Sequence, residues 1–333
     1  MMGMSGRWQA LALAAVVAAV VVVPWAGTGY VRSLVVLSGL AVVAVAGLAL
    51  LVGFAGQLSL AQGAFYGLGA YGFAVLAVRF GWPAPLALLG ALAGVGLAGW
   101  LVGLPMLRLR GHFLALGTLA FAVIVTVLLL ELGPLTGGPS GLAGVPSLRR
   151  VTIGPLALSG EIQYCYVAWA LALASLWLYQ RLIRSEVGLA LQAMSSSEVG
   201  TAAMGIDVGR LKLSVFVAAA LLGGLAGAVY ASYLSFISPA AFDIMLSVQL
   251  VVMVMVGGTA TFWGPLLGAL VVTGLVEVLR GVVAAVLPNV RGPVEIIALG
   301  LVLGLIMVWE PGGLVARLGQ WRPGPRPAEV PGG

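Results

Sequence analysis

Long apolar stretches recur along the chain, and most of them are bounded by Gly, Pro or a charged residue. A run of about 20 apolar residues is long enough to cross the hydrocarbon layer as a helix. The pattern predicts an all-α, polytopic bundle of about ten (eight to ten) membrane helices, forming one transmembrane domain over residues 1–318. The predicted helices lie at residues 8–26, 31–52, 58–78, 84–104, 112–132, 164–183, 211–234, 245–261, 264–286 and 293–309.

The helix count depends on two short connections and on the first apolar run. Residues 53–57 and 256–264 are uncharged and Gly-rich, so each is either a tight turn at the membrane surface or a break inside the bilayer. Both alternatives stay open at this point. The first run is expected to remain as a helix, because no small-x-small cleavage site follows it.

Composition agrees with a membrane protein. Only 8% of the 333 residues are charged and 62% are hydrophobic, whereas a soluble domain carries about 25% charged residues. With one Cys (Cys165) and one His (His112), the chain can form no internal disulfide, Cys cluster or multi-His metal site. We therefore predict no metal site. The net charge of +6 is better explained by Arg in cytoplasmic loops than by nucleic-acid binding.

The basic residues predict an orientation with both termini in the cytoplasm. On this map ten basic residues lie inside and six outside, a bias in the direction of the positive-inside rule. The inner set is Arg7, Arg108, Arg110, Arg181, Arg184, Arg210, Lys212, Arg317, Arg322 and Arg326, and the outer set is Arg32, Arg79, Arg149, Arg150, Arg280 and Arg291.

Two loops are longer than a simple turn. The outer loop, about 133–163, is rich in Gly and Pro and is expected to form ordered turns rather than helix. The inner loop, about 184–212, predicts a short amphipathic helix whose apolar face is Val187, Ala190, Leu191 and Met194. The tail 319–333 is Pro/Gly-rich and is expected to be disordered.

A second short helix is predicted in the inner loop. Ser197 can cap its N-terminus, the helix runs through Met204, and Gly205 suits the position after it. A helix–turn–helix of this kind on a transporter is a natural docking surface for another subunit.

The segment 53–71 is unusually polar and Gly-rich for a membrane helix. Ser59, Gln62 and Tyr66 would share one helix face. With Gln57, they either hold helices together or form the polar end of a broken helix that faces a translocation path. The path is our weaker functional prediction for these four residues.

Glycines in the same segment predict close helix packing. Gly63 and Gly67 form a ridge of small residues. A related pattern, with Gly264 and Gly268, follows Phe262, so the chain could contain an internal repeat of broken helices.

Residues 195–212 resemble the cytoplasmic coupling loop, the Glu-Ala-Ala…Gly motif, of bacterial ABC importer permeases. Together with 56–59, 63–71 and 257–269, which occur in the expected order, the resemblance covers about residues 30–310. The chain is similar to the branched-chain amino acid permease family, and its length resembles the LivM-type rather than the shorter LivH-type subunit. It departs from the family at Ser195–Ser197, where charged residues are usual. The resemblance assigns coupling to the ATPase to Glu198, Ala202, Ala203, Gly205 and Asp207.

The resemblance implies a permease subunit that moves Leu, Ile, Val or related amino acids across the bacterial cytoplasmic membrane. It implies a second, LivH-like permease subunit, two ATP-binding subunits and a periplasmic substrate-binding protein as partners. The sequence contains no P-loop, so we expect no cofactor on this chain and ATP hydrolysis on separate subunits. The chain is therefore expected to be a transport subunit and not an enzyme.

Two alternatives remain from the sequence. Permeases for urea, amides or sugars share this architecture. A stand-alone secondary transporter or channel would require an ionisable residue in mid-membrane. The acids instead fall near predicted helix ends, and Glu277 and Arg280 are spaced to pair with each other.

Overall fold

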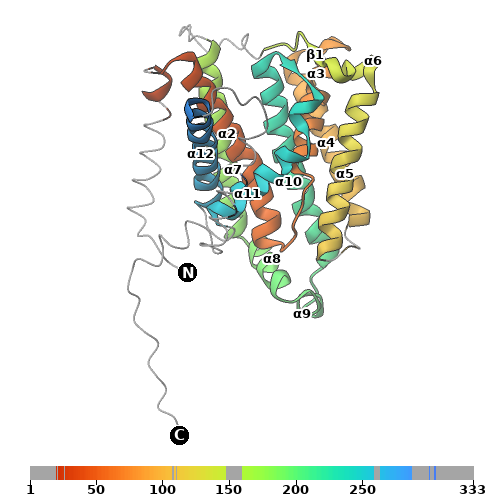
Figure 1. Cartoon of the computed structure of the whole chain (residues 1–333). Helices are drawn as coiled ribbons and strands as arrows, with labels where there is room; N and C mark the ends of the chain where they lie inside the picture. The colour runs from red at the N-terminus through yellow and green to blue at the C-terminus, as the bar shows by residue number, and fades with distance from the viewer. Residues whose placement is uncertain are drawn as a thin grey trace, which may run out of the picture.

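The protein is a bundle of long helices in the computed structural model (Figure 1), which describes residues 22–25, 27–106, 111–147, 160–258 and 263–286, with single positions 20, 109, 300 and 304. Most of the helix predicted at 8–26, the helix at 293–309, the tail and both termini lie outside these residues. The elements are α2 (Gly29–Ala49), the π-helix η1 (Leu50–Phe54), α3 (Gln62–Val78), α4 (Ala84–Met106), α5 (His112–Glu131), α6 (Gly133–Thr136), η2 (Gly138–Ser140), β1 (Leu142–Ala143), α7 (Gly160–Ile183), α8 (Glu186–Ser196), α9 (Glu198–Ala203), α10 (Val208–Leu234), β2 (Phe236–Ile237), η4 (Pro239–Phe242), α11 (Ile244–Gly257) and α12 (Gly264–Val286).

Among the described residues, seven helical segments are long and apolar enough to cross a membrane, and α3 is a shorter apolar helix. The prediction of an all-α, multi-pass membrane protein is confirmed, whereas the count of ten helices is not reached within the described part of the chain. The seven segments are Gly29–Phe54, Ala84–Met106, His112–Glu131, Gly160–Ile183, Val208–Leu234, Pro239–Gly257 and Gly264–Val282.

Two ends of the bundle are distinct. The short helices α8 and α9 protrude at one, the α8–α9 end, and β1, β2 and α6 lie at the opposite end (Figure 1). There Leu142 pairs with Ile237 in a two-stranded antiparallel ladder. The expectation of turns without helix for the loop 133–163 is wrong over its first part, because α6 and η2 form there, each with a Pro in its first turn. Residues 148–159 of this loop lie outside the described residues.

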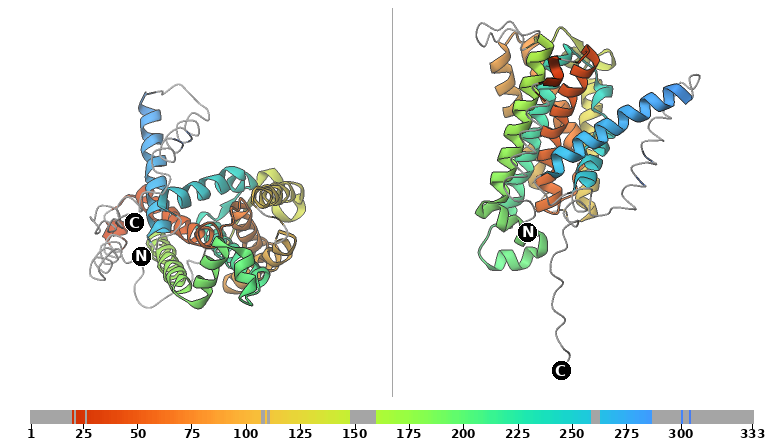
Figure 2. Two further views of the ribbon diagram at one scale, coloured as in Figure 1. Left: turned by 90° about the horizontal axis from the view of Figure 1, so that it is seen from below. Right: turned by 90° about the vertical axis from the view of Figure 1, so that its left-hand side faces the viewer.

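The core is formed by α2, α3 and α10. In α2 almost every residue from Val36 to Ala49 is buried, so this helix is surrounded by protein rather than lipid. The helices α4 and α5 lie on one side of the core, with α7 and α12 on the other (Figure 2), and α4 and α5 expose most of their large apolar side chains. A helix that is apolar on all sides but only half covered by protein is typical of the lipid boundary.

Glycine allows α3 and α10 to cross with their backbones in contact. A Cβ atom on Gly227 would lie 1.8 Å from the carbonyl oxygen of Tyr66, and one on Gly69 would lie 2.0 Å from that of Gly224. Small residues let membrane helices approach this closely, and the contact replaces the hydrophobic driving force that lipid cannot supply. The two helices are therefore fixed relative to each other near the centre of the bundle.

The connection between α2 and α3 turns at the α8–α9 end, where the exposed Gly56 lies next to Ser195 of α8, and then re-enters the helix layer as a non-helical segment. After η1, residues 55–61 are non-helical, and Gln57, Ser59 and Ala61 are buried while Gly56 and Leu58 are exposed. Gln62, the first residue of α3, contacts Ala44, which lies about three helical turns, or about 15 Å, before the end of η1. The chain therefore returns into the bundle as a non-helical segment before α3 starts.

This break corrects one prediction. Ser59 does not share a helix face with Gln62 and Tyr66, because the helix starts only at Gln62. Irregular backbone is tolerated at membrane depth where protein buries it and satisfies its polar groups. Here Leu60 N donates to Thr118 Oγ1 at 2.9 Å, and Ala61 N donates to Ser59 Oγ at 3.3 Å.

The choice between a surface turn and a break at 256–264, between α11 and α12, is not tested, because residues 259–262 lie outside the described residues. The two Gly-rich patterns, around Gly67 and around Gly264, also occupy different positions relative to their helices. Phe65 lies within α3, whereas Trp263 precedes the first residue of α12.

We expect Gly227→Ala to destabilise the protein strongly. The added Cβ meets the Tyr66 backbone, which cannot rotate away, and overpacking of this kind costs about 1–3 kcal/mol or more. Gly94→Ala in α4 is the matched control, because a Cβ there meets nothing within 4 Å. The measurement is the thermal unfolding midpoint in detergent, and equal midpoints for the two variants would contradict the close crossing.

Candidate functional site

The α8–α9 end carries a pair of short helices whose N-termini are set by local capping. Ser185 Oγ accepts from Gly188 N at 3.4 Å at the start of α8, and Ser197 Oγ accepts from Gly200 N at 3.1 Å at the start of α9. Gly205 has φ of 83°, the left-handed conformation that glycine adopts without strain after a helix. The predicted second helix of the inner loop, with its Ser197 cap and Gly205 terminator, is confirmed.

The buried face of α8 differs from the prediction. Leu191 and Met194 are buried as expected, but Val187 is exposed and Gly188 is buried in its place. The turn after α7 brings the backbone of Gly188 against the carbonyl of Ile183, where a Cβ would lie only 2.2 Å from the oxygen. This contact rotates α8 so that Val187 points outward.

The residues predicted to couple to an ATPase lie at the tip of this loop. Ala202, Ala203, Gly205 and Asp207 are exposed, and Glu198 is partly buried. Asp207 caps α10 by accepting from Arg210 N at 3.0 Å and also pairs with the Arg210 side chain. Two large apolar side chains that the sequence analysis did not single out, Val199 and Met204, are 78% and 67% exposed at the same tip. The tip therefore presents a small, partly apolar surface that nothing in this chain covers among the described residues.

An ion pair fixes α9 to the first turns of α10. Lys212 Nζ donates to Glu198 Oε1 at 2.5 Å, and the Lys212 side chain is only 7% exposed. Glu198 was predicted in the coupling loop from the sequence, but its partner was not. Lys212 is the only Lys in the chain, and this was the one sequence feature that could have pointed to it as the partner of Glu198. In one continuous helix, residues 14 positions apart would be separated by about 21 Å along the axis, so the turn between α9 and α10 is what brings the two together.

The predicted translocation residues are mostly buried in the bundle core. Gln57 is 8%, Ser59 2% and Gln62 1% exposed. The Nε2 atom of Gln62 donates to the carbonyl oxygens of Ala44 at 3.0 Å and Ala219 at 3.1 Å. This side chain therefore bridges α2, α3 and α10 at the level where α3 begins.

The glycines predicted to serve packing lie against neighbouring helices. Gly63 N donates to Ser247 Oγ in α11 at 2.9 Å, and a Cβ on Gly67 would lie 3.0 Å from Phe242 Cβ. A Cβ on Gly268 would lie 1.9 Å from the carbonyl oxygen of Met253. Gly264 contacts Gly257, so α11 and α12 also pack backbone to backbone.

An open cavity of about 220 Å³ lies between α2, α11 and α12, and Tyr66 of α3 and Tyr230 of α10 also line it. The rings of these two tyrosines meet edge to face, with centroids 5.6 Å apart. Of the four predicted translocation residues, only Tyr66 lines this cavity.

The charged edge of the cavity is formed by α12. Glu277 Oε2 and Arg280 Nη1 are 3.4 Å apart, so the predicted pairing of these two residues is confirmed. The hydroxyl of Tyr30, near the start of α2, donates to Glu277 Oε1. The contact joins α2 to α12 at this edge.

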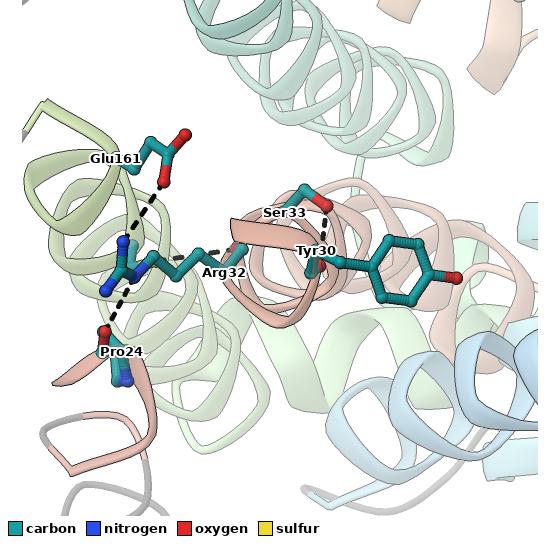
Figure 3. A network of polar contacts seen from close by, with 6 residues as sticks. Pro24, Tyr30, Arg32, Ser33 and Glu161 are labelled. Atoms are coloured by element: carbon teal, nitrogen blue, oxygen red, sulfur yellow. Dashed lines mark hydrogen bonds and ion pairs between the residues drawn. The ribbon is translucent and has the colours of Figure 1, made fainter. Parts of the chain in front are cut away.

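A second ion pair lies near the same end but outside this cavity. Arg32 Nη1 is 3.4 Å from Glu161 Oε2, and Arg32 Nε donates to the Pro24 carbonyl (Figure 3). It joins the first turns of α2 and α7. In the figure the ring of Tyr30 points away from Arg32, toward α12.

Residues 30–309 match the family described as branched-chain amino acid transport system, permease component. The chain is 32% identical over 292 residues to the high-affinity branched-chain amino acid transport system permease protein LivM of Escherichia coli K12, a match that covers 81% of this chain and 66% of that protein. It is 33% identical over 296 residues to the LivM protein of Salmonella typhimurium, with the same coverage. The chain thus spans just under two thirds of the length of these relatives.

A probable branched-chain amino acid transport permease protein LivM of Methanocaldococcus jannaschii is 25% identical over 238 residues, covering 68% of this chain and 67% of that protein. No solved structure matches the chain.

The Glu198–Lys212 pair predicts unequal effects of its two partners. Glu198→Gln leaves a buried ammonium without its counterion, whereas Lys212→Met leaves a carboxylate that is 39% exposed and can be hydrated. Removing one partner of a buried pair costs up to about 3–5 kcal/mol, so we expect Glu198→Gln to lower the unfolding midpoint more than Lys212→Met. The double variant should recover part of the loss. Equal and additive losses in thermal unfolding would show that the two side chains do not interact.

Proposed function

Because the chain belongs to the branched-chain amino acid permease family, we propose that it is one membrane-spanning subunit of an ATP-binding cassette importer. Its cargo would be Leu, Ile, Val or a related amino acid. Its membrane would be the bacterial cytoplasmic membrane, with the α8–α9 end facing the cytoplasm. A second, LivH-like permease subunit would complete the pathway. A periplasmic binding protein would deliver substrate at the opposite end, and two ATP-binding subunits would dock on the cytoplasmic side.

The protruding α8–α9 pair is the observation that carries this proposal. A stand-alone transporter or channel has no need for two capped helices held outside the bundle by a buried ion pair. An ATPase subunit would contact the exposed tip, where Val199 and Met204 supply apolar area and Asp207 supplies charge. The relatives are named as permeases, and we propose that this chain likewise catalyses no covalent reaction and binds no ATP.

Force from the ATPase would reach the core through α10. The Glu198–Lys212 pair ties α9 to α10, and α10 carries Ala219, whose carbonyl accepts from Gln62. Closure of the ATPase pair would therefore displace α9, α10 and the start of α3 together. Rigid-body movement of this kind switches a packed bundle between two arrangements, because close-packed helices are not continuously deformable.

We expect Gly205→Pro to abolish association with the ATPase subunits while leaving the membrane bundle folded. Proline fixes φ near −65° and cannot adopt the 83° seen at Gly205. Gly81→Pro is the matched control, since Gly81 has φ of 67° in an exposed turn at the opposite end. The readout is co-purification of the ATPase from detergent-solubilised membranes. Recovery of the ATPase with Gly205→Pro, or with a deletion of residues 197–205, would overturn the docking role.

We expect Gln62→Leu to reduce amino acid uptake in reconstituted vesicles without preventing assembly. The change removes the two hydrogen bonds that join α3 to α2 and α10. Interhelical hydrogen bonds in membranes average about 0.6 kcal/mol each, so the stability loss should stay near about 1 kcal/mol. Unchanged uptake together with this small loss of stability would assign Gln62 to helix packing alone.

A further inference from the structure

The cavity between α2, α11 and α12 has the chemistry that a free amino acid requires. We propose that it is a binding site for a zwitterionic amino acid with a branched aliphatic side chain, occupied during passage through this subunit. This inference rests on the proposed transport function and adds the residues by which this chain itself recognises its cargo.

Two opposite charges at the cavity edge match the two charges of an amino acid. Glu277 and Arg280 lie one turn apart on α12, line the same cavity and are 3.4 Å from each other. An α-ammonium group is matched by the Glu277 carboxylate, and an α-carboxylate by the planar guanidinium of Arg280, which offers paired donors. The other residues that line the cavity are uncharged. The Arg280 side chain is 53% and the Glu277 side chain 25% exposed, so both charged groups at this edge are accessible to an entering molecule.

The size and polarity of the remaining wall suit a small aliphatic side chain. Leu34 and Leu37 from α2, Leu246, Leu250 and Met253 from α11, and Val276 from α12 form an aliphatic lining. A Leu, Ile or Val side chain would bury its methyl groups against this surface, at about 25 cal/mol per Å² of apolar area. At about 220 Å³, the cavity is smaller than the roughly 300–1,000 Å³ of pockets for drug-sized ligands. It therefore suits one small metabolite and not an oligopeptide or an oligosaccharide.

The charged pair favours amino acids over the other cargoes of this architecture. Urea, amides and sugars carry no net charges, so they would leave the two ions at the cavity edge without new partners. A zwitterion offers one partner of each sign at the spacing of a single α-carbon. Gln249 and Thr273 add neutral hydrogen-bonding groups to the same wall.

The alternative is that Glu277 and Arg280 only clamp α12 to α2 through Tyr30. A clamp would treat every cargo alike, whereas a binding site assigns one charge of the cargo to each side chain. The Arg32–Glu161 pair supplies the control, because it also joins two helices near the same end with a 3.4 Å contact but does not line this cavity.

The test is radiolabelled leucine uptake into vesicles that contain the complete importer, with its binding protein and ATP. We expect Glu277→Gln and Arg280→Met to lower uptake by about tenfold or more, equivalent to about 1.4 kcal/mol. Stimulation of ATP hydrolysis by the loaded binding protein should persist. Glu161→Gln should retain wild-type uptake. If the wild-type importer moves no branched-chain amino acid, the proposed function itself fails. If the wild type transports leucine and both cavity variants match it, only the cavity site is overturned.

Competition at the importer without its binding protein distinguishes binding from clamping. Leucine binding is measured directly against leucinamide, which lacks the carboxylate, and 4-methylpentanoate, which lacks the ammonium group. We expect Arg280→Met to lose discrimination against leucinamide and Glu277→Gln to lose discrimination against 4-methylpentanoate, while Arg280→Lys retains the preference for a carboxylate. An identical change in discrimination for the two variants would assign the pair to helix clamping and overturn the proposal.

Discussion

The start of α3 inside the helix layer is the constraint on which much of this structure depends. A helix that begins at Gln62 needs an extended segment, 55–61, to carry the chain back into the bundle, and that segment exposes backbone groups that lipid cannot satisfy. Thr118 Oγ1 and Ser59 Oγ accept hydrogen bonds from this segment, and its residues Gln57, Ser59 and Ala61 are buried. The single side chain of Gln62 then connects α3 to both α2 and α10 through two hydrogen bonds.

Close packing by glycine makes the same region rigid. The α3–α10 crossing has backbone in contact with backbone at Gly69 and Gly227, so α10 cannot move without α3. At its other end α10 carries Lys212, buried and paired with Glu198 of α9. The exposed tip of the inner loop and the polar centre of the bundle are thus parts of one mechanically continuous unit, about 27 residues long along α10. A rigid connection of this kind would transmit movement of a docked ATPase subunit to the bundle core, as the proposed importer requires.

Charge is scarce, and its placement follows a simple rule. In the described residues each ion pair lies at a helix end, in the inner loop or on α12. Pairs at helix ends need no functional explanation, because the interface hydrates them. The α12 pair is different, since it borders a cavity whose other lining residues are uncharged and mostly apolar. This edge of the cavity is therefore where the proposed zwitterion would meet a group of each sign.

The sequence alone determined the helical class, most of the spans, the capped helix that begins after Ser197, and the family. These depend on local features, such as apolar runs, capping side chains and a glycine at a positive φ, whose physics acts within a few residues. Tertiary structure decided that Ser59 leaves the helix, that Gly188 and not Val187 is buried, that Lys212 pairs with Glu198, and that Tyr66 alone of the predicted path residues borders the cavity. Each of these results from contacts between helices far apart in the chain, and an apolar pattern that looks alike on every side of a membrane helix does not specify them.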